Sequence, residues 1–136
     1  MIKLCSGCRQ ADLKRKMVTL TTTLVGKTYS ARVPGFICDN CGADEVGDYE
    51  LYAFELSVAK KLLDAPELLG QAFRYCRRTY GLSRHNYAHH NSIPPEEIRR
   101  LEENNATVGG RIRGPIMRSI DEAYNKLGYK PDISVA

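Results

Sequence analysis

Four of the five cysteines fall into two pairs with the same spacing, Cys5–Cys8 and Cys38–Cys41. The two pairs are separated by residues 9–37, a stretch of 29 residues. Zn²⁺ prefers four thiolate ligands at the corners of a tetrahedron, and each CxxC turn points two sulfurs at one centre. Because four cysteines leave no open coordination position, the spacing predicts a structural zinc site. A redox-active CxxC pair and an iron site with the same ligands are the alternatives.

The other residues that could do chemistry give weaker patterns. We predict that Cys76, which stands among arginines, is a buried core residue and not a reactive thiol. His85 and His89 are one helical turn apart, but they lack the glutamate of an HExxH motif, so we expect surface or packing histidines. The order of the residues indicates no serine–histidine–acid set and no catalytic carboxylate pair. We therefore expect that the protein is not an enzyme.

Arginine is concentrated in the second half of the chain. The net charge is +4, yet residues 71–118 hold nine arginines, no lysine and four glutamates. The planar guanidinium group can bind two phosphate oxygens at once. The cluster therefore indicates phosphate recognition, with a solvated helical surface as the alternative.

The segment between the cysteine pairs has the alternation of β-strands. Apolar residues alternate with polar ones over 18–24 and again over 29–33, and Gly26-Lys27 and Pro34-Gly35 are typical of turns. We predict three short strands closed by zinc, a small zinc-ribbon-like domain over residues 1–45. Its apolar core is thin, so metal binding is expected to supply much of its folding free energy.

From Asp48 the apolar residues follow a helical period. The pattern predicts a connecting helix within 46–64, a fresh helix start at Asp64-Ala65-Pro66-Glu67, and helices over 66–79, 84–90, 95–104 and 115–127. Residues 109–114 are expected to form a flexible loop. The predicted fold class is α+β, with the zinc-ribbon-like β domain followed by an all-α domain over 65–136. Two short helices joined by a tight break have the outline of a helix-turn-helix.

Particular residues strengthen that outline. The residues Gly81-Leu82-Ser83-Arg84, Ala88, Ile93, Ile98 and Leu101-Glu102-Glu103-Asn104 resemble the lambda-repressor-like (XRE-type) helix-turn-helix. Together with the double CxxC, the chain resembles the MqsA-type antitoxins over most of its length. In that family the zinc domain binds an mRNA-cleaving toxin, and the C-terminal domain dimerises and represses the operon. Arg84 and Asn104 depart from the family, which has glutamine and glycine there, and His89-His90-Asn91 stand where apolar residues would pack.

The resemblance implies a homodimeric repressor of double-stranded DNA with the following site residues. The implied base contacts are Pro95, Glu96, Arg99 and Arg100, the phosphate contacts are Arg84, Arg111, Arg113, Arg74 and Arg78, and a buried ion pair joins Arg77 to Glu102. Arg100 can bind guanine N7 and O6 with two hydrogen bonds. Glu96 can accept from cytosine N4, or, like Glu97, can simply favour the positive end of the helix macrodipole.

A second function is compatible with the same residues. The chain can be a protein-interaction module whose zinc domain grips a partner, such as a toxin, while the helix-turn-helix serves mainly for dimerisation. The glutamates and the histidine-rich short helix favour this alternative, and the arginine cluster opposes it. The sequence contains no apolar run typical of a signal peptide or a membrane span, so we expect a cytoplasmic protein with reduced thiols and no membrane partner.

Overall fold

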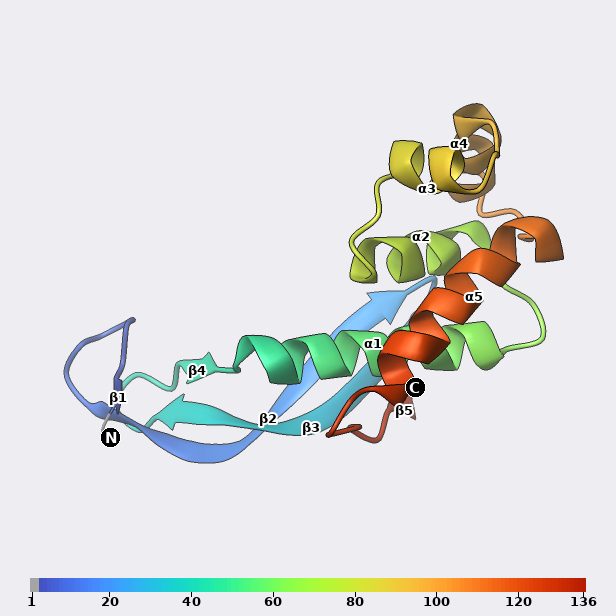
Figure 1. Ribbon diagram of the computed structural model, residues 1–136. Coiled ribbons are helices and arrows are strands. Elements are labelled where there is room, and N and C mark those ends of the chain that lie inside the picture. Colours follow the sequence, from blue (N-terminus) through green and yellow to red (C-terminus); the bar gives the residue numbers. More distant parts are fainter. Residues whose placement is uncertain (1–2) are drawn as a thin grey trace.

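The computed structural model describes residues 3–136. Within that range the chain has the predicted α+β class, with an antiparallel sheet and five helices (Figure 1). The strands are β1 (Lys3–Leu4), β2 (Asp12–Leu24), β3 (Lys27–Cys38), β4 (Asp44–Glu45) and β5 (Ser134–Val135). The helices are α1 (Asp48–Asp64), α2 (Gly70–Thr79), α3 (Arg84–His90), α4 (Pro95–Glu103) and α5 (Gly110–Asn125).

The sheet is dominated by one long hairpin. Strands β2 and β3 pair without interruption from Leu13↔Cys38 to Leu24↔Lys27. Val25 and Gly26 have φ of 48° and 79°, the left-handed pair that a two-residue hairpin turn requires. The predicted turn at Gly26 is therefore confirmed within one residue. The predicted second turn at Pro34-Gly35 is wrong, because both residues lie inside β3.

Pro34 is tolerated inside the strand because its missing N–H faces away from β2. Thr28 exchanges backbone hydrogen bonds with Ala136 on the outer edge of β3, and Pro34 has the same parity along the strand. Within residues 3–136, that edge is paired with β5 and β4 only at its two ends, so Pro34 falls in the gap between them. Gly35 is required because a Cβ there would lie 2.6 Å from the Glu45 carbonyl oxygen.

The hairpin buries opposite faces at its two ends. Leu13 and Val18 are both buried although they are an odd number of positions apart, which places them on opposite faces of the sheet. At one end Leu13 and Cys38 form a small cluster with Cys5. At the other end Tyr29 and Ala31 join the main core under the helices. Figure 1 shows α1 lying along this hairpin, with the N-terminal loop beyond its end.

Helix α2 begins at Gly70 and not at Pro66 as predicted. The segment before it is extended: the Leu68 carbonyl accepts from the Val108 N–H, and the Gly70 N–H donates to the Ala106 carbonyl. The side chain of Asn105 accepts a hydrogen bond of 2.9 Å from the N–H of Gln71 and so caps the helix. The cap from Asn105, more than thirty positions later in the chain, therefore sets the start of α2 in place of the predicted start at Pro66.

Helix α5 begins at Gly110, so residues 110–114 are helical and not a flexible loop as predicted. It contains Pro115, which cannot donate to the helical ladder. The hydroxyl of Tyr87 enters the ladder here: it donates to the Ile112 carbonyl at 2.5 Å and accepts from the Ile116 N–H at 3.1 Å. This buried contact from α3 bridges the Ile116 N–H and the Ile112 carbonyl, the helical pair next to the one that the proline removes. The remaining helix predictions agree with α1, α3 and α4 to within one residue at each end.

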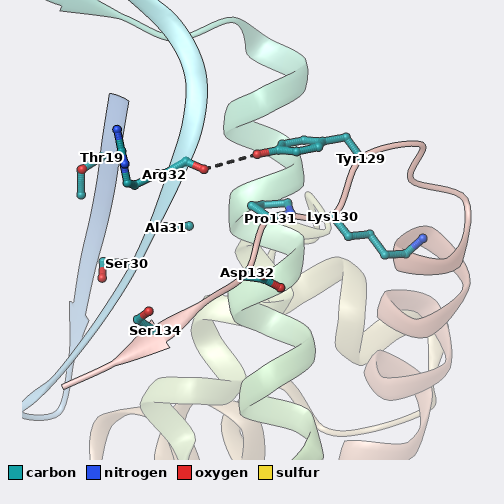
Figure 2. A pocket seen from close by; sticks show the side chains of 9 residues that line it. All are labelled: Thr19, Ser30, Ala31, Arg32, Tyr129, Lys130, Pro131, Asp132 and Ser134. Carbon is teal, nitrogen blue, oxygen red and sulfur yellow. Dashed lines mark hydrogen bonds between the residues drawn. The ribbon is translucent and has the colours of Figure 1, made fainter. Parts of the chain in front are cut away.

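The chain returns to the sheet after α5. β5 pairs with β3 at Tyr29 and Ser30, and the Tyr129 hydroxyl donates to the Arg32 carbonyl at 3.3 Å (Figure 2). One apolar core therefore joins β3, the helices and Leu127 near the C-terminus. Whether the parts fold independently is a property of the chain in solution, so the division into 1–45, 46–64 and 65–136 stays a prediction. Among the described residues, no helix is long and apolar enough to cross a membrane.

Candidate metal centre and nucleic-acid interface

The four paired cysteines converge on one point at the far end of the hairpin. The sulfur atoms of Cys5, Cys8, Cys38 and Cys41 all lie within 4.8 Å of one another, and none forms a disulfide. The Sγ–Sγ distance is 3.6 Å for Cys5–Cys41 and 3.7 Å for Cys8–Cys38. With Zn–S bonds of about 2.3 Å, the edge of a ZnS₄ tetrahedron is about 3.8 Å. The four thiols therefore fit one tetrahedral metal ion, although the geometry alone does not choose the metal.

The two cysteine turns have closely similar backbones. The N–H of Arg9 donates to the Cys5 carbonyl at 3.0 Å, and the N–H of Gly42 donates to the Cys38 carbonyl at 2.9 Å. Arg9 and Gly42 both have positive φ, of 55° and 76°. Each CxxC turn thus closes with one left-handed residue after its second cysteine. Glycine suits that conformation on the second turn, whereas on the first turn an arginine adopts it.

Local dipoles favour the thiolate form of the first pair. The Asn40 side-chain amide, 3.5 Å from Sγ, and the Gln10 backbone N–H lower the pKa of Cys8 to about 6. The backbone N–H of Cys8 lowers the pKa of Cys5. At Cys41 the Ala43 N–H also lowers the pKa, but the Cys5 thiol and burial raise it to about 11. A bound cation would favour the thiolate form of all four cysteines, including Cys41, because metal-bound cysteines lose their protons.

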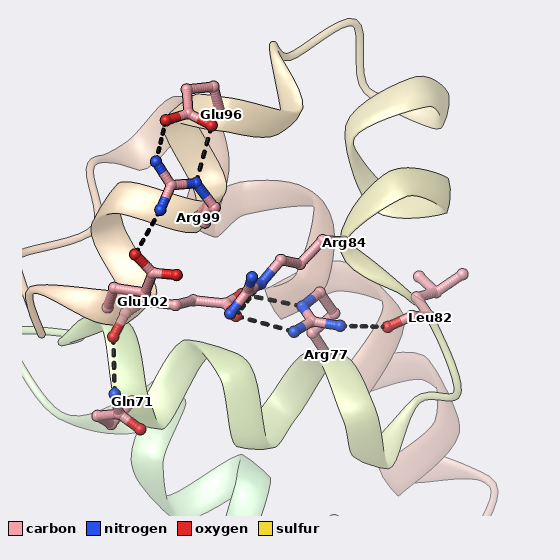
Figure 3. Close-up of polar contacts among 8 residues, drawn as sticks. Gln71, Arg77, Leu82, Arg84, Glu96, Arg99 and Glu102 are labelled. Carbon is pink, nitrogen blue, oxygen red and sulfur yellow. Dashed lines mark hydrogen bonds and ion pairs between the residues drawn. The ribbon is translucent and has the colours of Figure 1, made fainter.

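A second cluster fixes the short helices to α2. Arg77 and Glu102, both buried, form a two-pronged ion pair with N···O distances of 2.9 and 2.8 Å (Figure 3). The Arg77 guanidinium also donates to the Leu82 carbonyl, and Arg84 donates to Glu102 at 2.9 Å. The Glu102 carboxylate on α4 therefore links Arg77 near the end of α2 to Arg84 at the start of α3. The structure brings this implied ion pair together and adds Arg84, an implied phosphate contact, to it.

The outer face of α4 carries the implied base contacts, and its charges are partly paired. Pro95 and Glu96 are exposed at its start. Arg99 contacts Glu96 and Glu103, which raises the pKa of its guanidinium and lowers that of the Glu96 carboxyl (Figure 3). The side chain of Arg100 is 72% exposed and its nearest carboxylate oxygen, on Glu96, is 3.7 Å away. Arg100 is the freer of the two cations.

The implied phosphate contacts divide into two groups. Arg74 and Arg78 are exposed on α2, and together with the start of α3 they line one open groove. Arg111 is exposed but pairs with Glu97 at 3.0 Å. Arg113 points inward and donates to the carbonyls of Leu63, Ala65 and Pro66 at the end of α1. It caps that helix, so it is not available to a phosphate in this conformation.

The other minor expectations have clear outcomes. Cys76 is buried and burial raises the pKa of its thiol to about 12, which agrees with a core residue. In α3 the buried residues are Tyr87 and Ala88, whereas His89 and His90 are exposed. Although the histidines do not pack inward, Tyr87 and Ala88 attach the helix to the core. Sequence reasoning did not single out Tyr87 or Asn105, because neither lies in a recognisable motif and both act on distant segments.

Comparison with known proteins adds no relative: no protein-family model matches the chain, and no curated protein matches it. The functional assignment therefore depends on the residues and their geometry.

Proposed function

We propose that this protein is a sequence-specific DNA-binding transcriptional regulator with a structural zinc site. In this proposal α3 and α4 form a helix-turn-helix, and α4 is the helix that enters the major groove. The observation that carries the proposal is the exposed Arg100 on a short helix that the buried Arg77–Glu102 pair holds in a fixed orientation.

The fixed orientation matters because a base contact has strict geometry. Two hydrogen bonds from one guanidinium to guanine N7 and O6 require the supporting helix to be held firmly. Ile98 and Glu102 are buried on the inner side of α4, whereas Arg100 is on its outer side and Pro95 is exposed at its N-terminal end. In Figure 1, α3 and α4 lie at the opposite end of the molecule from the N-terminal loop. The buried residues of α4 are Ile98 and Glu102, and the rest of its side chains are at least partly exposed.

The neighbouring cations support contact with the DNA backbone. Arg74, Arg78 and Arg84 line one groove beside the start of α3. Arginine at such positions can hold phosphates and fix the register of the protein without reading sequence. Arg84 can do so with its free nitrogens while its Nε stays bonded to Glu102. Arg113 is left out of this interface because it caps α1.

The metal would act as a structural element. We infer zinc from the preference of this ion for four thiolate ligands, and four cysteine ligands leave no position for a substrate. The fully buried apolar cluster around them consists of Cys5, Leu13 and Cys38, with partly buried Cys8, Ala11, Phe36 and Ala43 packed against it. So small a cluster means that the ion would supply most of the local stability. An iron ion in the same ligand set is the alternative, which metal analysis of the purified protein decides.

Arg100→Ala is the direct test of the DNA-reading role. Selection of bound duplexes from a random pool first gives the preferred site. We expect the substitution to weaken binding to that site by about 1–3 kcal/mol and to relax specificity at one base pair, because a two-pronged contact is lost. Binding to random DNA should change far less. Fluorescence anisotropy at fixed salt measures both.

Arg15→Ala is the matched control, because Arg15 is an exposed arginine on β2 beyond the helices. Its binding should equal that of the wild type. An equal loss on the selected and random duplexes for Arg100→Ala would remove its base-reading role. If the random pool gives no preferred site, the DNA-reading proposal is wrong.

A second function is favoured by one specific observation. Glu96 and Glu103 neutralise Arg99, and Glu97 neutralises Arg111, so much of the positive charge near α4 is already paired. This favours a protein-interaction module, and the resemblance to antitoxins suggests a toxin as the partner of the cysteine end. Failure of the DNA selection, together with co-purification of an RNA-cleaving protein encoded beside this chain, would support this alternative. Success in both experiments would support an autoregulating antitoxin.

A further inference from the structure

A hollow opens between the tip of the hairpin, α1 and α2. It is lined by Leu24 of β2, Glu55 of α1 and a face of α2 that carries Arg74, Tyr75 and Arg78. Arg74 and Tyr75 stand four and three positions before Arg78, so the three side chains lie on one side of the helix. The volume of the hollow is about 430 Å³, which is within the range of small-molecule sites. Its lining includes no cysteine and no residue of α4.

The charged groups of this hollow have no partner within the part of the chain that the structure describes. Over residues 3–136, the side chains of Glu55, Arg74 and Arg78 form no hydrogen bond and no ion pair. Glu55 is half-buried, and burial raises the pKa of its carboxyl without an offsetting contribution from either arginine. The enclosed hydroxyl of Tyr75 also lacks a hydrogen-bond partner there. One carboxylate and two guanidinium groups therefore line the same hollow without neutralising one another.

We propose that this hollow binds a small zwitterion, namely a free amino acid or a dipeptide. The ammonium group of the ligand binds the Glu55 carboxylate, and its carboxylate binds the guanidinium groups of Arg74 and Arg78. An apolar side chain on the ligand packs against Leu24 and the ring of Tyr75. Because no ion pair joins Glu55 to either arginine, the two charged groups of the ligand have room between them.

The charges of the hollow favour a zwitterion over simpler ions. A purely anionic ligand would bind the arginines, but it would bury the Glu55 carboxylate further without a counter-ion, which is costly. A simple amine would satisfy Glu55, but the two guanidinium groups would repel it. A ligand that carries both charges satisfies all three side chains at once.

Such a ligand would also compete with DNA. Arg74 and Arg78 line the groove beside the start of α3 that we assign to DNA phosphates. A ligand carboxylate held by these arginines would take the place of a phosphate and lower the affinity for DNA. This consequence rests on the proposed function, whereas ligand binding itself does not. If the ligand binds without weakening DNA binding, the phosphate role of the two arginines is wrong and the ligand site stands.

Thermal shift assays identify the preferred ligand. The full metal-loaded chain is mixed in turn with each protein-forming amino acid and with glycyl-leucine, and calorimetry without DNA then gives the dissociation constant of the most stabilising one. We expect saturable binding of one molecule per chain. The amine and the acid that each lack one charged group of that ligand, isopentylamine and isocaproate in the case of leucine, should bind about tenfold more weakly or worse. Absence of saturable binding, or equal binding of either analogue, would overturn the proposal.

Glu55→Gln and Arg78→Ala test the two ends of the ligand separately. Each should raise the dissociation constant about tenfold or more, because a charge-assisted hydrogen bond is lost. Glu55 has no partner in the described chain, so Glu55→Gln should fold like the wild type, which circular dichroism checks. Glu50→Gln is the matched control, since it makes the same change in the first turn of α1, outside the hollow. Unchanged binding in either hollow variant, or an equal loss in the control, would reject the site.

Discussion

Glu102 is the residue on which the orientation of the short helices depends most. It is 1% exposed and accepts hydrogen bonds from both Arg77 and Arg84. We expect Glu102→Gln to lower the free energy of unfolding by about 3–5 kcal/mol, because the buried Arg77 charge loses its counter-ion and meets an amide N–H₂. Urea denaturation followed by circular dichroism measures the loss.

Glu103→Gln is the control for that substitution, because Glu103 is the next residue along α4 and its ion pair with Arg99 is exposed. Its removal should cost about 1 kcal/mol or less. Equal losses for the two variants would mean that the burial of Glu102 contributes nothing.

Residues with a local signal could be predicted from the sequence, and residues that act at a distance could not. The cysteines were found from their spacing, and the Arg77–Glu102 pair from the pattern of a resembling motif. The contacts of Arg113 could not be predicted, because the carbonyls it caps belong to the end of α1, some fifty positions earlier. In the sequence, an arginine that caps a distant helix cannot be distinguished from one that binds a phosphate.

At the level of elements, α2 and α4 approach each other closely at Gly70. A Cβ on Gly70 would lie 1.9 Å from the Leu101 carbonyl oxygen, so the backbones would have to separate. Gly70→Ala should therefore be destabilising by about 2 kcal/mol or more, as overpacking commonly is. A glycine-to-alanine substitution within a helix usually stabilises the protein, by about 1 kcal/mol, so the expected effect at Gly70 is opposite to the usual one.

Gly110→Ala is the matched control. Gly110 is the first residue of α5, as Gly70 is of α2, and a Cβ on it would meet nothing within 4 Å. Thermal unfolding should give an equal or higher midpoint for Gly110→Ala and a lower one for Gly70→Ala. If both alanines stabilise, the close approach of α2 and α4 is not as described.

Element boundaries were predicted well where the deciding residues are near in sequence. Ser83 caps α3 from within its own first turn, by accepting from the Asn86 N–H, and that helix was predicted without error. The starts of α2 and α5 were misplaced by several residues. Asn105 caps α2 from another segment, and the Tyr87 hydroxyl of α3 bonds to α5 next to Pro115. Pro115 favours a helix end by local rules, and this contact with a distant residue is not visible in the local sequence.

At the scale of the whole molecule, the sequence predicted a cysteine-bound β part and a helical part. It did not predict that the hairpin belongs to both. The alternation of strand residues reveals a buried face, but it does not say that Leu13 and Cys38 pack in one cluster while Tyr29 and Ala31, on the opposite face, pack in another. Nor did it predict that β5 returns to β3. The hairpin is therefore expected to respond to the metal at one end and to the helices at the other.

Removal of the metal tests this division of the hairpin. On adding a chelator we expect amide hydrogen exchange, followed by mass spectrometry, to accelerate in residues 5–13 and 38–45, whose small cluster needs the ion. The half that contains Tyr29 and Ala31 should stay protected, because these residues pack in the main core. Helical circular dichroism should change little. Chelator already saturated with zinc is the control. Loss of protection in α1 and α5 at the same chelator concentration would show one cooperative unit, which would contradict both this expectation and the predicted domain boundaries.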